Sequence, residues 1–263
     1  MIDLLREDFV IRALIATVAV GVAAPVVGAF AVQRGQSLIG DGVAHVAFAG
    51  VGLAFLAGVA PLWGALAAAV VAAVVLHVLQ RRGLAGDVAL AVVFYSGIAL
   101  GFLFAARAGA AGAGLIGVLF GSPLTLDPID VAVVVGLAVA TVGTVVVLRR
   151  PLVAIAFDAD AARVSGVRVE RLTLGMTVLA ALVVVGGMLS VGILLVGALM
   201  VIPTAAAARV ARSYRGTLAL ASLAGGVSAV GGMLASLQFD LAPGPAVVLS
   251  AVVLYAVVSL IRT

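Results

Sequence analysis

One long uncharged stretch of the chain, LTLGMTVLAALVVVGGMLSVGILLVGALMVIPTAAAA (residues 172–208), decides the fold class. As a single α-helix it would be about 55 Å long, whereas the hydrocarbon core of a bilayer is about 30 Å thick. The stretch must therefore fold back on itself, and the glycines of GGMLSVG (186–192) suit a tight turn. We predict two membrane-spanning helices here, over 172–189 and 190–208.

The rest of the chain has the same character. Of its 263 residues 65% are hydrophobic and 10% are charged, and the mean hydropathy is +1.38. A soluble domain of this length is not so apolar, and long continuous apolar runs do not match the alternation of a β-barrel. We predict an all-α polytopic membrane protein with a single transmembrane domain over 1–263. The nine expected spans are 13–32, 39–58, 63–79, 87–106, 129–148, 172–189, 190–208, 216–236 and 245–261.

The arginines predict the orientation of these spans. With nine spans, one side of the membrane receives twelve arginines and the other receives three, namely Arg6, Arg12 and Arg107. By the positive-inside rule, the N-terminus is then outside and the C-terminus is cytoplasmic. Eight spans would spoil this asymmetry. The segment LIGVLFG (115–121) is too short to cross, and we expect it at the outer interface. The twelve are Arg34, Arg81, Arg82, Arg149, Arg150, Arg163, Arg168, Arg171, Arg209, Arg212, Arg215 and Arg262.

Residue types that the chain lacks narrow the function. It has no cysteine, which excludes thiolate metal sites and disulfides, and all 15 of its basic residues are arginine. A phosphate-binding P-loop needs a lysine, so any ATP that drives this protein must be bound by another subunit. The arginines are scattered between apolar runs, which argues against nucleic acid as a partner. No HExxH or GxSxG motif is present, so we expect no enzyme and no catalytic residues.

The second expected span carries two ionisable residues, Asp41 and His45, in GDGVAH (40–45). At a spacing of four on a helix, their side chains share one face, about 5–6 Å apart at Cβ. A carboxylate and an imidazole so placed can share a divalent cation. The competing interpretation is that Asp41 caps the helix and His45 hydrogen-bonds within the bundle. His77, at the end of the third span, is expected to be an interfacial anchor.

Two further features concern movement and docking. Pro203 interrupts the seventh span, where it frees a backbone carbonyl one turn earlier and predicts a kink, with a gate as one possible use. The longest cytoplasmic segment, 149–171, has the signature of a short helix that begins at Asp158 or Asp160 and stops at Gly166. Phe157, Ala161 and Val164 are expected to share one face, with Arg163 and the acids outward. A solvated loop is the alternative, but its length favours a docking element.

The order of these segments resembles the metal-ion family of ABC importer permeases, the zinc, manganese and iron type. The resemblance covers nearly the whole chain. It rests on GDxxxH within LIGDGVAHVAFAGVGLAFLAG (38–58), GDVALAVVFYSGIALG (86–101), LFGSPLTLDPIDV (119–131), FDADAARVSGVRV (157–169), VGILLVGALMVIPTAAAA (191–208) and PGPAVVLSAVVLYAVVSL (243–260).

The resemblance implies a homodimeric permease in the bacterial cytoplasmic (inner) membrane, embedded in membrane lipid. It implies two cytoplasmic ATP-binding subunits and an extracytoplasmic metal-binding protein as partners. Asp41 and His45 would be pathway ligands for a transported Zn²⁺ or Mn²⁺, with no permanently bound cofactor. The segment Phe157–Gly166, comprising Phe157, Asp158, Asp160, Ala161, Arg163, Val164 and Gly166, would dock into a groove of the ATPase.

The cargo and the energy source each have alternatives. Zinc is the first expectation, although residues 94–96 read FYS where some zinc-type members carry a histidine. A manganese or iron importer of the same family is the alternative. Three further alternatives are an ABC permease for an organic chelate, a secondary carrier driven by an ion gradient, which would need no ATPase, and a purely structural membrane subunit, in which Asp41 and His45 would tolerate substitution.

Overall fold

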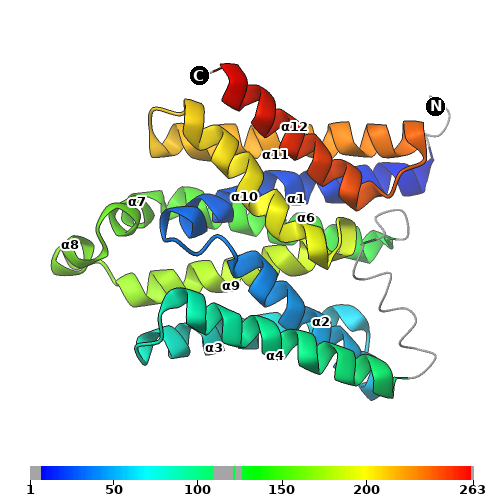
Figure 1. The fold of residues 1–263 in the computed structure, drawn as a ribbon, viewed down its shortest axis with the longest axis horizontal. Helices are drawn as coiled ribbons and strands as arrows, with labels where there is room; N and C mark the ends of the chain where they lie inside the picture. Colours follow the sequence, from blue (N-terminus) through cyan, green and yellow to red (C-terminus); the bar gives the residue numbers. More distant parts are fainter. Residues whose placement is uncertain (1–6, 109–120, 122–125, 262–263) are drawn as a thin grey trace.

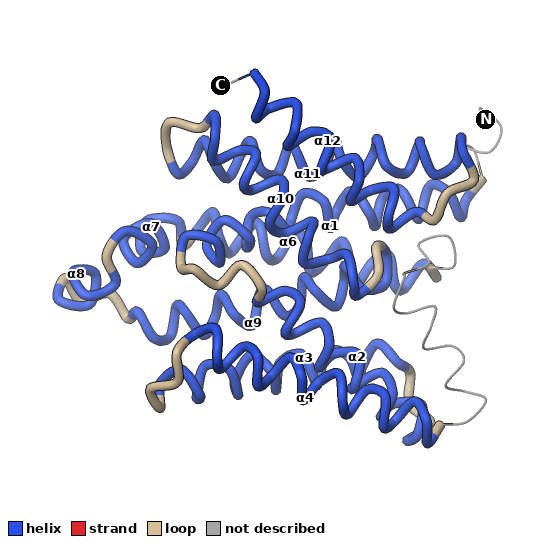
Figure 2. Tube along the Cα trace, in the orientation of Figure 1, coloured by secondary structure: helices blue, strands red, loops and turns tan. Residues whose placement is uncertain are grey.

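The computed structural model describes residues 7–108, 121 and 126–261. These residues form helices joined by turns and loops, and no strand occurs among them (Figure 2). The predicted segment 115–121 lies outside the described residues, apart from Gly121. The helices are α1 (Asp8–Gln33), α2 (Ile39–Ala57), α3 (Pro61–Arg81), α4 (Gly86–Arg107), α6 (Pro128–Val147), α7 (Arg149–Phe157), α8 (Ala159–Val164), α9 (Val169–Ser190), α10 (Ile193–Val210), α11 (Tyr214–Phe239) and α12 (Pro243–Ile261).

Each of the nine predicted spans overlaps one of the long helices. In the described part of the chain, eight helices are long and apolar enough to cross a membrane. The ninth, α10, has a shorter apolar run over Val196–Val210. The chain is therefore an all-α membrane protein with about eight to ten apolar helices. How many of them cross the bilayer, and in which direction, stays a prediction.

The reversal expected in 186–192 is present. α9 ends at Ser190 and α10 begins at Ile193, so the helices are separated by two residues. Gly192 has φ +97°, a conformation that an L side chain rarely adopts, and a tight turn needs such a residue. The uncharged stretch 172–208 is thus two helices rather than one. Figure 1 shows α10 running back from the end of the molecule that α9 reaches.

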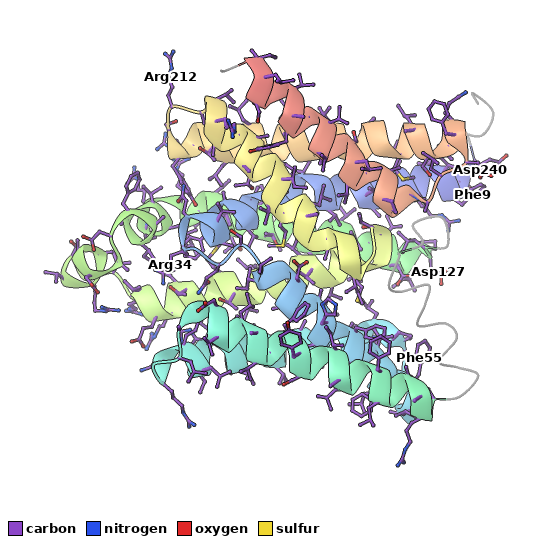
Figure 3. All side chains as sticks on the ribbon, viewed as in Figure 1. Phe9, Arg34, Phe55, Asp127, Arg212 and Asp240 are labelled. Carbon is purple, nitrogen blue, oxygen red and sulfur yellow. The ribbon has the colours of Figure 1, made fainter. Side chains whose placement is uncertain are left out.

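The long helices alternate in direction between two ends of the molecule (Figure 1). Arg34 and Arg212 lie at the end that also carries α7 and α8, whereas Asp127 and Asp240 lie at the opposite end (Figure 3). Arg34 and Arg212 thus lie at one end of the molecule, and which end faces the cytoplasm stays a prediction. We call the first end the arginine end.

The helices form an inner group and an outer group. Most of the apolar window is buried in α1 (72%), α2 (67%) and α9 (61%), against 22–33% in α3, α4, α6, α11 and α12. Glycine lets helices of the inner group approach their neighbours closely. A Cβ at Gly28 of α1 would overlap the backbone carbonyl of Met200 in α10, and one at Gly50 of α2 would overlap that of Gly64 in α3. Close backbone contact of this kind drives helix association in lipid, where the hydrophobic effect does not.

Candidate functional site

Asp41 lies in the first turn of α2, close to the arginine end. Leu38 is the N-cap residue of this helix, and no side chain caps it. The expectation that Asp41 itself caps the helix is therefore wrong, because the helix begins two residues earlier. A carboxylate in the first turn still faces the positive end of the helix dipole, which lowers the cost of keeping it there.

His45 is oriented by its own helix. Its Nδ1 lies 2.8 Å from the backbone carbonyl oxygen of Asp41. When Nδ1 carries the proton and donates to that carbonyl, Nε2 keeps a lone pair for a cation or another donor. The imidazole also packs on Phe94 of α4, with ring centroids 4.5 Å apart and planes at 57°. Two contacts from two helices thus hold the ring.

Neighbouring glycines position the turn that carries both residues. A Cβ at Gly197 of α10 would overlap the Asp41 carboxylate, so that carboxylate occupies the space that a side chain at 197 would fill. On the α4 side, a Cβ at Gly97 would lie 2.7 Å from the carbonyl carbon of His45. The turn is therefore held between α4 and α10, and at each of the two contacts the neighbouring residue lacks a side chain.

Asp41 lines a pocket of about 470 Å³ formed by the α1–α2 connection, α2 and α4. Its polar lining consists of Gln36, Ser37, Asp41, Asp87 and Tyr95. Phe94 also lines the pocket, and its ring contacts the ring of His45. The pocket offers oxygen atoms, which are the ligands that hard divalent cations prefer.

Within the described part of the chain, the Asp41–His45 pair belongs to no larger metal-binding group. Across the described ranges, no group of three or more His, Cys, Asp or Glu residues is placed to hold one metal ion. His77 lines a different pocket with Arg34 and Glu170. A cation at Asp41 and His45 would therefore complete its shell with water, neutral oxygens or groups from another chain, which suits a site that must release its ion.

The segment at the arginine end contains two helices, not one. Phe157 is the last residue of α7, and Asp158 adopts an extended conformation before α8 starts. The expectation that Phe157 shares a helical face with Ala161 and Val164 is therefore wrong. The predicted cap and stop are confirmed. The Asp158 carboxylate accepts hydrogen bonds of 2.9 Å from the backbone N–H of Asp160 and of Ala161.

α8 ends at Val164, and Gly166 follows its C-cap with φ +83°. Arg163 and Asp160 form an exposed ion pair at 2.7 Å. Phe157 and Val164 are 82% and 90% exposed, whereas Ala162 is buried against the bundle. Two apolar side chains at the tip of the arginine end thus have little cover within the described part of the chain.

Pro203 lies inside α10, which continues as a helix beyond it. Because proline has no N–H, the carbonyl of Leu199 loses its intrahelical donor. The next residue, Thr204, donates to the carbonyl of Met200 (2.9 Å) and lies 3.0 Å from that of Pro25 in α1. This side-chain link joins α10 to α1 beside the proline. A gating role for Pro203 stays a prediction.

Sequence reasoning missed several residues around Asp41, including Gln36, Asp87 and Gly197. Asp87 carried one available signal, because it is an acidic residue in the first turn of an apolar helix, as Asp41 is. Gly197 carried none, because nothing in a glycine-rich span marks the one glycine that meets a carboxylate.

One family model, two relatives and one solved structure each match most of this chain. The model of the ABC 3 transport family matches residues 6–262. The manganese transport system membrane protein MntC of Halalkalibacterium halodurans is 31% identical, over 97% of this chain and 87% of its own. The chelated iron transport system membrane protein YfeD of Yersinia pestis is also 31% identical, over 92% and 81%. The solved structure of PsaBC from Streptococcus pneumoniae in complex with Fab superposes with a TM-score of 0.88 at 30% identity, covering 98% of this chain and 93% of that one.

Proposed function

The chain belongs to the ABC 3 transport family, and from this membership we propose that it is the membrane permease of an ATP-driven importer for divalent metal ions. It is a multi-pass membrane subunit of a bacterial ABC transporter and not itself an enzyme. The observation that carries the metal assignment is the oriented Asp41–His45 pair in the first turns of α2. Its imidazole already donates to a backbone carbonyl, so the remaining nitrogen is available to the cargo.

Manganese is the cargo that we propose, with iron second. The relatives with named cargo that are described above transport manganese or chelated iron, which supports the alternative to the zinc expectation better than zinc itself. The site supports the same order. The pocket beside Asp41 presents carboxylate, amide and hydroxyl oxygens, and a single imidazole stands near it. Oxygen-rich sets suit Mn²⁺, whereas zinc is more often held by several nitrogen or sulfur ligands.

We place the arginine end in the cytoplasm. The positive-inside rule supports this orientation, and α7 and α8 then project toward cytoplasmic partners. Asp41 lies near the cytoplasmic end of its span, so the ion would leave through the pocket that Asp41 and Asp87 line. Two copies of the chain, two ATP-binding subunits and an extracytoplasmic metal-binding protein complete the proposed complex. The chain's lack of lysine is consistent with ATP being bound elsewhere.

Coupling to ATP would pass through Phe157, Val164 and the caps of α8. An apolar tip that is 82–90% exposed at two side chains is costly to leave in water and suits a groove on a partner. Movement of α8 could reach the bundle through Ala162, which is buried, and through the short connection to α9.

Reconstitution tests the function directly. The permease is reconstituted with its ATPase facing the vesicle lumen and with the metal-binding protein outside, and the vesicles should accumulate Mn²⁺ only when the lumen contains ATP. Unlabelled Mn²⁺ and Fe²⁺ should compete better than Zn²⁺, and organic iron chelates should not compete. Uptake without any ATPase would support a secondary carrier instead. Stronger competition by Zn²⁺ than by Mn²⁺ would restore zinc as the cargo.

A further inference from the structure

A second pocket lies at the arginine end, away from Asp41. Its volume is about 390 Å³, and it lies where α3, α8, α9 and the α1–α2 connection meet. Figure 1 shows these ends on one side of the molecule, and Figure 3 places Arg34 there. The polar side chains that line it are Arg34, His77, Gln80, Arg81, Arg163, Glu170 and Thr173. Its ionisable lining is thus mainly basic, unlike that of the pocket at Asp41.

The guanidinium groups in this pocket are only partly neutralised. Arg81 Nη2 lies 3.3 Å from Glu170 Oε2, and Arg163 Nη1 lies 2.7 Å from Asp160 Oδ1. Arg34 forms no ion pair within the described residues. Each guanidinium has five N–H donors, so a single contact to a carboxylate leaves most of them available. Three arginines facing two carboxylates leave an excess of positive charge, even with His77 neutral.

Thr173 adds a hydroxyl that lacks a partner. It is 7% exposed, and its Oγ1 has no hydrogen bond in the structure. The next threonine along α9, Thr177, is also buried but donates its hydroxyl to the carbonyl of Thr173. A buried hydroxyl without a partner is unfavourable, because it has lost its hydrogen bonds to water without replacing them. An unpartnered hydroxyl on the wall of a basic pocket points to an oxygen-rich anion as the missing partner.

We propose that this pocket binds a phosphate group, contacted by Arg34, Arg81 and Arg163 with Thr173 at its inner wall. A phosphate offers several oxygens to guanidinium groups that approach from different elements, which a single carboxylate does less well. The excess positive charge excludes the cationic cargo. On the proposed orientation, the phosphate comes from the cytoplasm or from the headgroup of an anionic phospholipid.

Binding there would join α8 to the bundle. Arg163 belongs to α8, Arg81 to α3 and Arg34 to the α1–α2 connection. A phosphate held by all three would bridge elements that otherwise share few side-chain links, since Arg163 pairs only with Asp160 of its own helix among the ion pairs described. The site would stabilise one position of the segment proposed to dock on the ATPase.

Equilibrium binding to the full-length chain tests the inference. Radiolabelled inorganic phosphate is titrated onto the protein in nanodiscs of zwitterionic lipid. Native mass spectrometry in parallel asks whether phosphatidylglycerol is retained over phosphatidylcholine. Saturable binding in the first arm identifies free phosphate, and selective retention in the second identifies a lipid headgroup. Either result supports the site if Arg34→Gln weakens it by about tenfold or more.

Matched controls separate this site from general charge and from folding. Arg212→Gln removes an arginine at the same end but outside the pocket, and Thr141→Val removes another buried hydroxyl without a partner, in α6. Both should bind as the wild type does, whereas Thr173→Val should bind several-fold more weakly. Equal effects of Arg34→Gln and Arg212→Gln would overturn the proposal.

The proposal would also be overturned if neither inorganic phosphate nor phosphatidylglycerol bound to the protein. If Arg34→Gln weakened association with the ATPase in that case, the pocket would instead receive an acidic side chain of that partner. None of these readouts uses metal uptake, so the phosphate site can fail while the proposed transport function stands, and the reverse.

Discussion

The first turns of α2 and the short helix α8 both carry charged residues near the arginine end, yet they are held in different ways. Asp41 and His45 are positioned by other helices, since the carboxylate lies over Gly197 and the imidazole on Phe94. α8 is built from its own neighbours, with Asp158 at its start and Gly166 beyond its end. The comparison indicates that the geometry of the first region depends on the packing of the bundle, whereas the ends of α8 depend on residues close to it in sequence.

The largest effect is expected at the two ligands. Asp41→Ala and His45→Ala should each reduce ATP-dependent Mn²⁺ uptake by at least about a hundredfold, because a two-residue site loses half of its protein ligands. Asp8→Asn, which alters an exposed acid at the start of α1, is the control. Uptake into vesicles is the measurement, with ATPase co-purification as the check on assembly. Wild-type uptake by both alanine variants would remove the pair from the pathway.

Gly197→Ala should disturb the packing of α10 against Asp41 while leaving both proposed ligands unchanged. The added methyl group must displace the Asp41 carboxylate or separate α10 from α2, and overpacking of this kind costs about 1–3 kcal/mol. We expect Mn²⁺ affinity to fall by about tenfold or more.

Gly136→Ala and Gly143→Ala are the controls, since no atom lies within 4 Å of a Cβ at either position. They should leave binding and the thermal unfolding midpoint close to wild type. Titration calorimetry with Mn²⁺ on the purified chain measures the affinity. A thermal melt measures the unfolding midpoint. Unchanged Mn²⁺ affinity in Gly197→Ala would show that the carboxylate does not need that space.

The features that could be predicted from the sequence are those that depend on residues close together in the chain. The cap at Asp158, the stop at Gly166 and the reversal at Gly192 depend on residues within a few positions, and all three were predicted. The placement of Asp41 and His45 on one helix face was also predicted, because the two residues are four positions apart. Gly197 and Asp87 were not, because their roles come from contacts between helices far apart in the chain. The zinc expectation rested on overall composition rather than on any residue, and the relatives favour manganese or iron.

Val164→Asp tests the second region, the exposed tip at α8. A charge on a side chain that is 90% exposed leaves the fold intact but opposes docking into an apolar groove. We expect the ATPase to be lost from the purified complex, while Mn²⁺ binding to the chain changes by less than about twofold.

Ile129→Asp is the matched control, because Ile129 is 75% exposed at the start of α6, at the opposite end from α8. It should keep the ATPase bound. Retention of the ATPase by Val164→Asp would place the docking surface elsewhere.

The smallest effect is expected at the cap of α8. Asp158→Ala removes two hydrogen bonds to backbone N–H groups, which costs a helix about 1 kcal/mol. A helix of this length has little stability of its own, so its hydrogen exchange should speed up by about fivefold while that of α2 stays unchanged. Asp158→Asn retains a side-chain acceptor and should stay close to wild type. Because α8 contacts the bundle through Ala162 and few other residues, the loss should remain local. A matching change of exchange in α2 would mean that the two regions are coupled even without the ATPase, contrary to the independence that their packing indicates.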